Sequence, residues 1–141
     1  MAHARVPVTG GCLCGAVRYE LSQPPAAGSF CHCSMCRKQS GSLVGGALEF
    51  SGAALKFTRG EPKYFRSSPG SKRGFCGDCG SRVVWVSEVD PIVSVGIGSF
   101  DHPEDWPMTK DASWGRSQHI YVGSKVAWNA ITDGLPQRET E

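Results

Sequence analysis

Short apolar and β-branched runs, separated by glycine or proline, dominate the sequence. Residues 82–87 (RVVWVS) and 92–97 (IVSVGI) are the richest in such side chains, so we expect them to form the central strands of a sheet. Weaker runs of the same kind predict further strands at 16–21, 29–33, 43–50, 54–58, 63–67, 71–75 and 119–122. The pattern therefore predicts a mainly β domain of one or two antiparallel sheets.

Helical signals are confined to one short segment. Ser34 is a suitable N-cap, and a helix from there through Gln39 would end at Gly41. The two prolines within residues 23–28 (QPPAAG) predict a turn. Residues 1–10 are expected to form a lead-in, 11–136 a single domain and 137–141 a tail.

Composition narrows the class of protein. Eighteen glycines and nine prolines among 141 residues favour short strands and tight turns over long helices. The net charge of +2 gives no basic surface for nucleic acid, so no nucleic-acid partner is expected. The N-terminus lacks a signal-peptide pattern and no segment is apolar enough to span a membrane, which predicts a cytoplasmic protein without a membrane partner.

Seven cysteines carry the candidate chemistry. An odd number in a reducing compartment favours metal ligation over disulfides. Cys12 and Cys14 form a C-x-C pair whose sulfurs point to one side of extended backbone. Cys76 and Cys79 form a glycine-flanked C-x-x-C pair. The two pairs together predict a closed, structural Cys₄ zinc site.

The remaining cysteines lie within six residues, C-H-C-S-M-C. Cys31, Cys33 and Cys36 can surround one ion and leave its fourth position for substrate. Two alternatives stay open on spacing alone. Cys12 and Cys14 could instead pair with Cys31 and Cys33, leaving Cys36 with the later pair, or His32 or His119 could close a second structural site. The short loop of the triplet favours the four-plus-three division, and in extended backbone His32 would point away from the metal.

A zinc ion held by three thiolates has a formal charge of −1, suited to capturing a thiol and presenting its sulfur to an aldehyde. An anionic thiol such as glutathione would also need nearby cations. Arg37 is the first candidate, since it directly follows the triplet; the others are Lys38, Arg82 and Arg116. His119 is a candidate for substrate binding, and Glu49 and His119 are candidates for proton transfer, although neither is placed by spacing.

Five ordered segments carry a family resemblance: GGCLCGAVRYEL, CHCSMCRKQSG, FCGDCGSRV, HIYVGSKVAW and DGLP. Together they resemble the glutathione-dependent formaldehyde-activating family, whose domain is shared with centromere protein V. The resemblance implies an Mss4-like, all-β fold with two zinc ions per chain and a carbon–sulfur lyase reaction that joins glutathione and formaldehyde. It maps the structural zinc onto Cys12, Cys14, Cys76 and Cys79, and the catalytic zinc onto Cys31, Cys33 and Cys36.

Two other functions compete with a thiol–aldehyde enzyme. One is a non-catalytic zinc module that binds another macromolecule, and the other is redox sensing through oxidation of the triplet. The sequence leaves the physiological thiol, the aldehyde and the oligomeric state undetermined.

Overall fold

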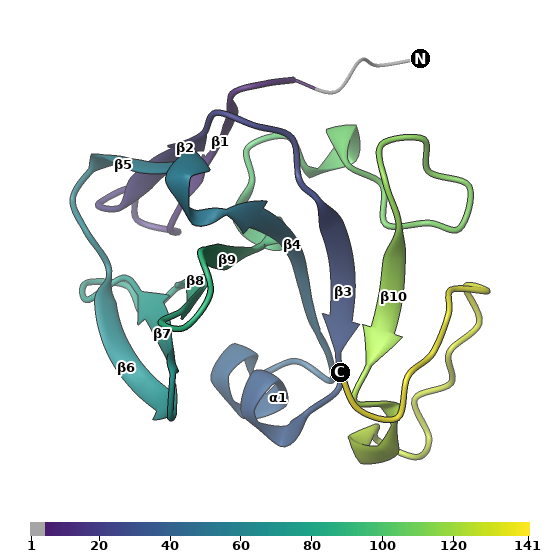
Figure 1. Ribbon diagram of the computed structural model, residues 1–141. Coiled ribbons are helices and arrows are strands. Elements are labelled where there is room, and N and C mark those ends of the chain that lie inside the picture. Colours follow the sequence, from purple (N-terminus) through teal and green to yellow (C-terminus); the bar gives the residue numbers. More distant parts are fainter. Residues whose placement is uncertain (1–4) are drawn as a thin grey trace.

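The structure, a computed structural model, describes residues 5–141 as a mainly β protein built from two sheets (Figure 1). The small sheet has the antiparallel order β1-β2-β5, and the large sheet has the order β10-β3-β4-β9-β8-β7-β6. The strands are β1 (Val8–Gly11), β2 (Arg18–Leu21), β3 (Ala27–Cys31), β4 (Gly45–Ser51), β5 (Leu55–Arg59), β6 (Lys63–Ser68), β7 (Ser71–Phe75), β8 (Arg82–Ser87), β9 (Ile92–Gly96) and β10 (Ser117–Ile120).

Helices are few and short within the described residues. One α-helix, α1 (Ser34–Ser40), follows β3 and lies at the end of the large sheet to which β3 runs (Figure 1). The remaining helical turns are η1 (Gly52–Ala54), η2 (Ile97–Ser99), η3 (Pro103–Asp105) and η4 (Val122–Ser124). None of these elements has the length and apolar character that crossing a membrane requires.

The predicted mainly β class is confirmed, and the two most apolar runs do lie at the centre of the large sheet as β8 and β9. One pairing departs from the antiparallel expectation, since β10 runs parallel to β3. Residues 8–11 pair with β2 as strand β1, so the small sheet begins within the predicted lead-in of residues 1–10. Because glycine has a low β propensity, the two glycines at the end of β1 weaken the strand signal in the sequence.

The hydrophobic core lies between the two sheets. Tyr19 and Leu21 of the small sheet are almost fully buried with Leu48, Val84 and Val95 of the large sheet. These large-sheet side chains share one face, because Leu48 is paired with Val95 and Val95 with Val84. The opposite face of the large sheet is therefore the one that carries Cys31 and Gly45, which are paired with each other on β3 and β4.

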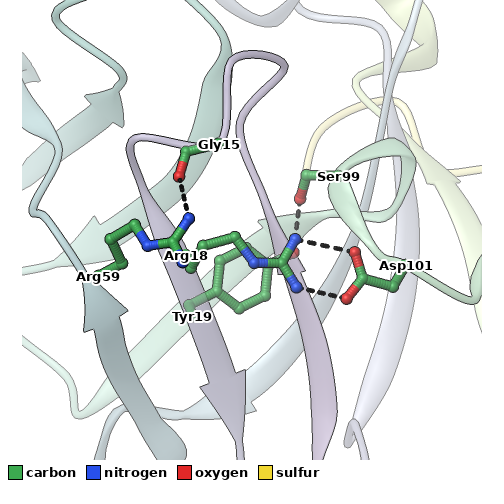
Figure 2. A network of polar contacts seen from close by, with 6 residues as sticks. All are labelled: Gly15, Arg18, Tyr19, Arg59, Ser99 and Asp101. Atoms are coloured by element: carbon green, nitrogen blue, oxygen red, sulfur yellow. Dashed lines mark hydrogen bonds and ion pairs between the residues drawn. The ribbon is translucent and has the colours of Figure 1, made fainter.

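A polar network joins the small sheet to the segment that follows β9 (Figure 2). Arg18 of β2 donates to both carboxylate oxygens of Asp101, at 2.9 and 2.5 Å. The buried Tyr19 hydroxyl lies 2.6 Å from the Ser99 hydroxyl. The Arg18 guanidinium holds the pKa of Asp101 down to about 2. These contacts tie the small sheet to the segment that follows β9.

The C-terminal segment is attached to the large sheet rather than free. Leu135 is buried, and the backbone N–H of His119 donates to the Pro136 carbonyl at 2.8 Å. Arg138 returns a backbone hydrogen bond to the His119 carbonyl at 2.9 Å. The segment thereby covers the outer edge of β10, an edge that would otherwise be unpaired.

Candidate metal centres

The first cysteine cluster forms where two loops meet. Cys12 and Cys14 lie in the connection between β1 and β2, and Cys76 and Cys79 lie in the connection between β7 and β8. Their four sulfurs lie within 4.8 Å of one another, with Cys14 Sγ 3.7 Å from Cys12 Sγ and 3.8 Å from Cys76 Sγ. Tetrahedral zinc with bonds of about 2.3 Å has sulfur–sulfur edges of about 3.8 Å. The donor set and its spacing therefore fit zinc.

The backbone conformation of the two loops brings the four cysteines of this cluster together. Gly15 and Gly80 have φ values of +83° and +77°, which only glycine adopts without strain, and each turns its loop back after the second cysteine. Backbone N–H groups then face the sulfurs: Val17 N lies 3.3 Å from Cys12 Sγ, and Asp78 N lies 3.4 Å from Cys76 Sγ. The cluster is thus held by neutral dipoles from its own loops.

Ser81 links the two loops of the four-cysteine cluster. Its hydroxyl accepts a hydrogen bond from Leu13 N at 3.0 Å and lies 3.2 Å from Cys79 Sγ. The Ser81 hydroxyl is the main cause that lowers the pKa of Cys79 to about 5. Sequence reasoning did not single out Ser81, because its contact with Leu13 crosses 68 residues.

The second cluster is the triplet, Cys31, Cys33 and Cys36. Cys31 ends β3, Cys33 precedes α1 and Cys36 lies in its first turn, so that the three sulfurs also lie within 4.8 Å of one another. Within residues 5–141 no His, Asp or Glu joins them as a fourth candidate ligand. The structure therefore groups the seven sulfurs as four and three, and the alternative division across the two loops does not occur. Three convergent thiolates fit zinc as a donor set.

The helix start differs from the prediction. Cys33, not Ser34, is the N-cap, and its sulfur accepts from Cys36 N at 3.3 Å. The cause is that Cys33 still has extended dihedrals while Ser34 is already helical. The helix ends at Gly41 as predicted, with a φ of +70° and its N–H on the Arg37 carbonyl. The capping bond holds Cys33 and Cys36 on one side of the triplet.

Arg73 of β7 is the triplet's closest cationic neighbour. Its guanidinium places Nη1 at 3.6 Å and Nη2 at 3.7 Å from Cys36 Sγ, and Nη1 also donates to Gln39 Oε1 at 3.0 Å. The pKa of the Cys36 thiol is lowered to about 5, first by a hydrogen bond with Cys31 and then by Arg73. The contact of Arg73 was not predicted, since Arg73 lies 37 residues beyond Cys36 in the sequence. Gln39 became a candidate only through its contact with Arg73.

Arg82 of β8 lies on the same side. A Cβ on Gly45 would stand 2.8 Å from Arg82 Nη1 and 3.4 Å from Cys36 Cβ. Burial lowers the pKa of Arg82, and the nearby Cys36 sulfur opposes that shift. Glycine at position 45 is thus what allows the guanidinium to approach the triplet.

A buried histidine pair lies behind the triplet. His32 Nε2 is 2.8 Å from His119 Nδ1, and His119 Nε2 is 2.8 Å from Asp133 Oδ2. The His119 ring also stacks on Phe30 at a centroid distance of 5.1 Å. Both nitrogens of His119 are therefore engaged, and His119 is paired with Phe30 on the face opposite to Cys31. Its predicted role in substrate binding stays a prediction.

The other predicted site residues are scattered. Arg37 is partly buried on α1 next to Cys36, while Lys38 is exposed on the same helix.

Arg116 is exposed and lies just before β10, at the end of that strand remote from the triplet. Glu49 lies on β4 on the same face as Gly45, four residues further along. Among the predicted cations, Arg82 comes near the triplet from β8, and Arg37 lies beside Cys36 on α1.

Tyr121 is a further neighbour of the triplet that the sequence did not indicate. It directly follows β10 with φ of +55°, the only positive φ at a non-glycine residue within the described chain. Burial raises the pKa of its phenol first, followed by the negative charge of Glu141 and of Cys31. Backbone strain of this kind clusters at functional sites.

Comparison with known proteins identifies the family. A family model described as glutathione-dependent formaldehyde-activating enzyme matches residues 7–124. No protein of curated function matches the chain. Among solved structures, a crystal structure of a Rhodobacter sphaeroides protein has 24% sequence identity and a TM-score of 0.56, over 66% of this chain and 87% of that one. At this identity, the likeness shows the fold alone.

Proposed function

The chain belongs to the glutathione-dependent formaldehyde-activating enzyme family, and on that premise we propose that it adds a small thiol to a small aldehyde or cleaves the adduct. Glutathione and formaldehyde are the proposed pair. The carbon–sulfur bond forms as the carbonyl double bond becomes a single bond, and the thiol proton ends on the new hydroxyl oxygen. The reaction is of the carbon–sulfur lyase type, and the reverse step breaks the same bond.

The observation that carries this proposal is the triplet of sulfurs without a fourth protein ligand among residues 5–141. Zinc held by Cys31, Cys33 and Cys36 would favour loss of the proton from an incoming thiol, because a coordinating thiol is readily deprotonated. The four-cysteine cluster, in which the protein itself supplies a complete tetrahedral set, is proposed as the structural zinc site.

The residues around the triplet would favour the binding of an anionic sulfur there. The Cys36 backbone N–H and the Arg73 guanidinium both donate to ligand sulfurs, which orients the sulfurs and limits their excess negative charge. Arg37, partly buried beside Cys36, is proposed to contact a carboxylate of the thiol substrate. We also place the protein in a reducing compartment, where the seven thiols remain available as ligands.

The test is NMR exchange spectroscopy at equilibrium between formaldehyde plus glutathione and their adduct, with and without zinc-loaded protein. We expect exchange faster than the uncatalysed rate, lost in Cys36→Ser and kept in Ser34→Ala, an exposed neighbour on the same helix. A fully metallated protein that accelerates exchange of neither glutathione nor 2-mercaptoethanol would contradict the proposal and favour a zinc-binding interaction module.

A further inference from the structure

Two arginines face the triplet without carboxylate partners. Arg73 is only 7% exposed and Arg82 is partly buried, yet neither forms an ion pair with Asp or Glu within the part of the chain that the structure describes. A buried guanidinium that lacks a counter-charge is costly, so buried cations are paired. The cysteine sulfurs of the triplet are the acceptors at hand, and Arg73 directs both terminal nitrogens at Cys36.

The strand pairing explains how both arginines reach this place. Arg73 lies opposite Trp85, but the register of β7 and β8 shifts by one residue between Gly74 and Phe75. As a result Arg82, rather than Val83, lies opposite Phe75. Because side chains at directly paired positions project from the same face, the shift places Arg82 on the face of Arg73. A regular ladder would have placed Val83 there instead.

Charge then distinguishes the kinds of ligand that the triplet can take. Three thiolates around a divalent zinc ion carry a formal charge of −1. Counted with the two guanidiniums of Arg73 and Arg82, this ensemble has a charge of +1. A fourth ligand that is itself an anion makes the ensemble neutral, whereas a neutral ligand leaves a buried positive charge. The four-cysteine cluster differs in both respects: it supplies four sulfurs itself, and within residues 5–141 these sulfurs contact backbone N–H groups and a serine hydroxyl.

We propose that Arg73 and Arg82 make the triplet site selective for an anionic fourth ligand, which for the thiol–aldehyde reaction is the substrate thiolate. This inference rests on the proposed function for the identity of that anion, but the preference for negative charge is a separate property of the site. The arginines do not react themselves; they act through the positive charge that they place beside the triplet. A purely structural role would affect the binding of charged and neutral ligands alike, whereas this role affects the binding of anions only.

The experiment uses the full chain with cobalt(II) in place of zinc, and follows the visible spectrum at fixed pH. Three probes are titrated: 2-mercaptoethanol, whose only ionisable group is the thiol; azide, an anion without sulfur; and imidazole, a neutral ligand. The variants are Arg73→Met, Arg82→Met and the charge-conserving Arg73→Lys. Arg66→Met serves as control, since Arg66 is an exposed residue of the neighbouring strand β6 and pairs with Glu88.

We expect each Met variant to weaken binding of 2-mercaptoethanol and azide by about tenfold, in line with the effect of one nearby charge on an anion. Imidazole affinity should stay within about twofold of the wild-type protein. Arg73→Lys should recover part of the anion binding, and Arg66→Met should match the wild type. If Arg73→Met does not fold, Arg82→Met and Arg73→Lys test the same discrimination.

Two results overturn the inference. One is unchanged anion affinity in the folded Met variants, and the other is an equal loss for anions and imidazole, which indicates a merely structural role. A wild-type cobalt protein that binds azide but no thiol would instead count against the proposed function. In that case the comparison of azide affinity between the wild-type protein and the Met variants still tests the charge selectivity. A failure of the proposed function can therefore be told apart from a failure of this inference.

Discussion

The two cysteine clusters differ in what surrounds their sulfurs. The four-cysteine cluster receives neutral donors, such as Val17 N at 3.3 Å from Cys12 Sγ. The triplet receives a guanidinium, with Arg73 Nη1 at 3.6 Å from Cys36 Sγ. A guanidinium beside three thiolates would favour an anion as the fourth ligand, whereas the first cluster already offers four sulfurs. From these surroundings we expect the four-cysteine cluster to be the closed site and the triplet to be the reactive one.

The clusters also differ in how much of the chain they join. Cys14 and Cys76 are 62 residues apart, and their cluster connects the loop of the small sheet to the large sheet. The triplet occupies six consecutive residues at the end of β3 and the start of α1. A crosslink that closes a long loop stabilises the fold more than one that closes a short loop. Stability should therefore depend on the first cluster and chemistry on the second.

The largest predicted effect is loss of the fold in Cys76→Ala. Structural zinc contributes an apparent free energy of about 10–16 kcal/mol in small zinc domains, comparable to the whole stability of a typical domain. Circular dichroism and soluble yield should show Cys76→Ala largely unfolded and Cys36→Ala folded with one zinc. Equal damage from the two substitutions would abolish the contrast between the clusters.

Chelation should separate the clusters in a second way. With increasing chelator, the first zinc equivalent is expected to leave the triplet, which has only three protein ligands, without loss of β-sheet signal. The second equivalent should leave together with unfolding. Metal release monitored alongside circular dichroism tests this order; release of both ions in one step with unfolding would show that the triplet is equally structural.

A smaller effect is expected from Ser81→Ala. The substitution removes the hydroxyl that contacts both Leu13 N and Cys79 Sγ, and should cost about 0.5–1.5 kcal/mol of unfolding free energy. Urea denaturation of the zinc-loaded protein measures it, with Ser34→Ala beside the triplet as a matched serine control. Ser81→Ala should leave thiol binding at the triplet unchanged, and a change there would couple the two clusters.

The smallest effect is expected from Asp101→Asn. Arg18 and Asp101 form a bidentate pair next to the four-cysteine cluster, but both side chains are about one-third exposed. Partly exposed ion pairs contribute only about 0.2–1 kcal/mol. Since the folded-state pKa of Asp101 is lowered to about 2, this contribution is present at neutral pH, so urea denaturation at pH 7 can measure it. A loss as large as that in Cys76→Ala would mean that the ion pair, rather than zinc, joins the sheets.

Much of the architecture was predictable because it is local. The limits of β6, β7 and β8 follow, to within one residue, from the glycines and prolines that separate these segments, and β8 is also rich in β-branched residues. Strand β1 was missed, since the residues VTGG carry a weak strand signal and are held by pairing with β2. The Cys33 cap was missed for a related reason: whether Cys33 or Ser34 begins the helix depends on where β3 ends.

The sequence by itself determined the mainly β class, the family resemblance and the residues that can act as metal ligands, because cysteine spacing within a loop limits which sulfurs can meet. Only the tertiary structure decided which loops combine, that His119 engages His32 and Asp133, and that Arg73 lies against Cys36. The physical reason is that these contacts depend on the order of the strands in the large sheet. The approach of Arg82 depends in addition on a single register shift between β7 and β8. Such pairings result from the packing of the whole core, and no short segment encodes them.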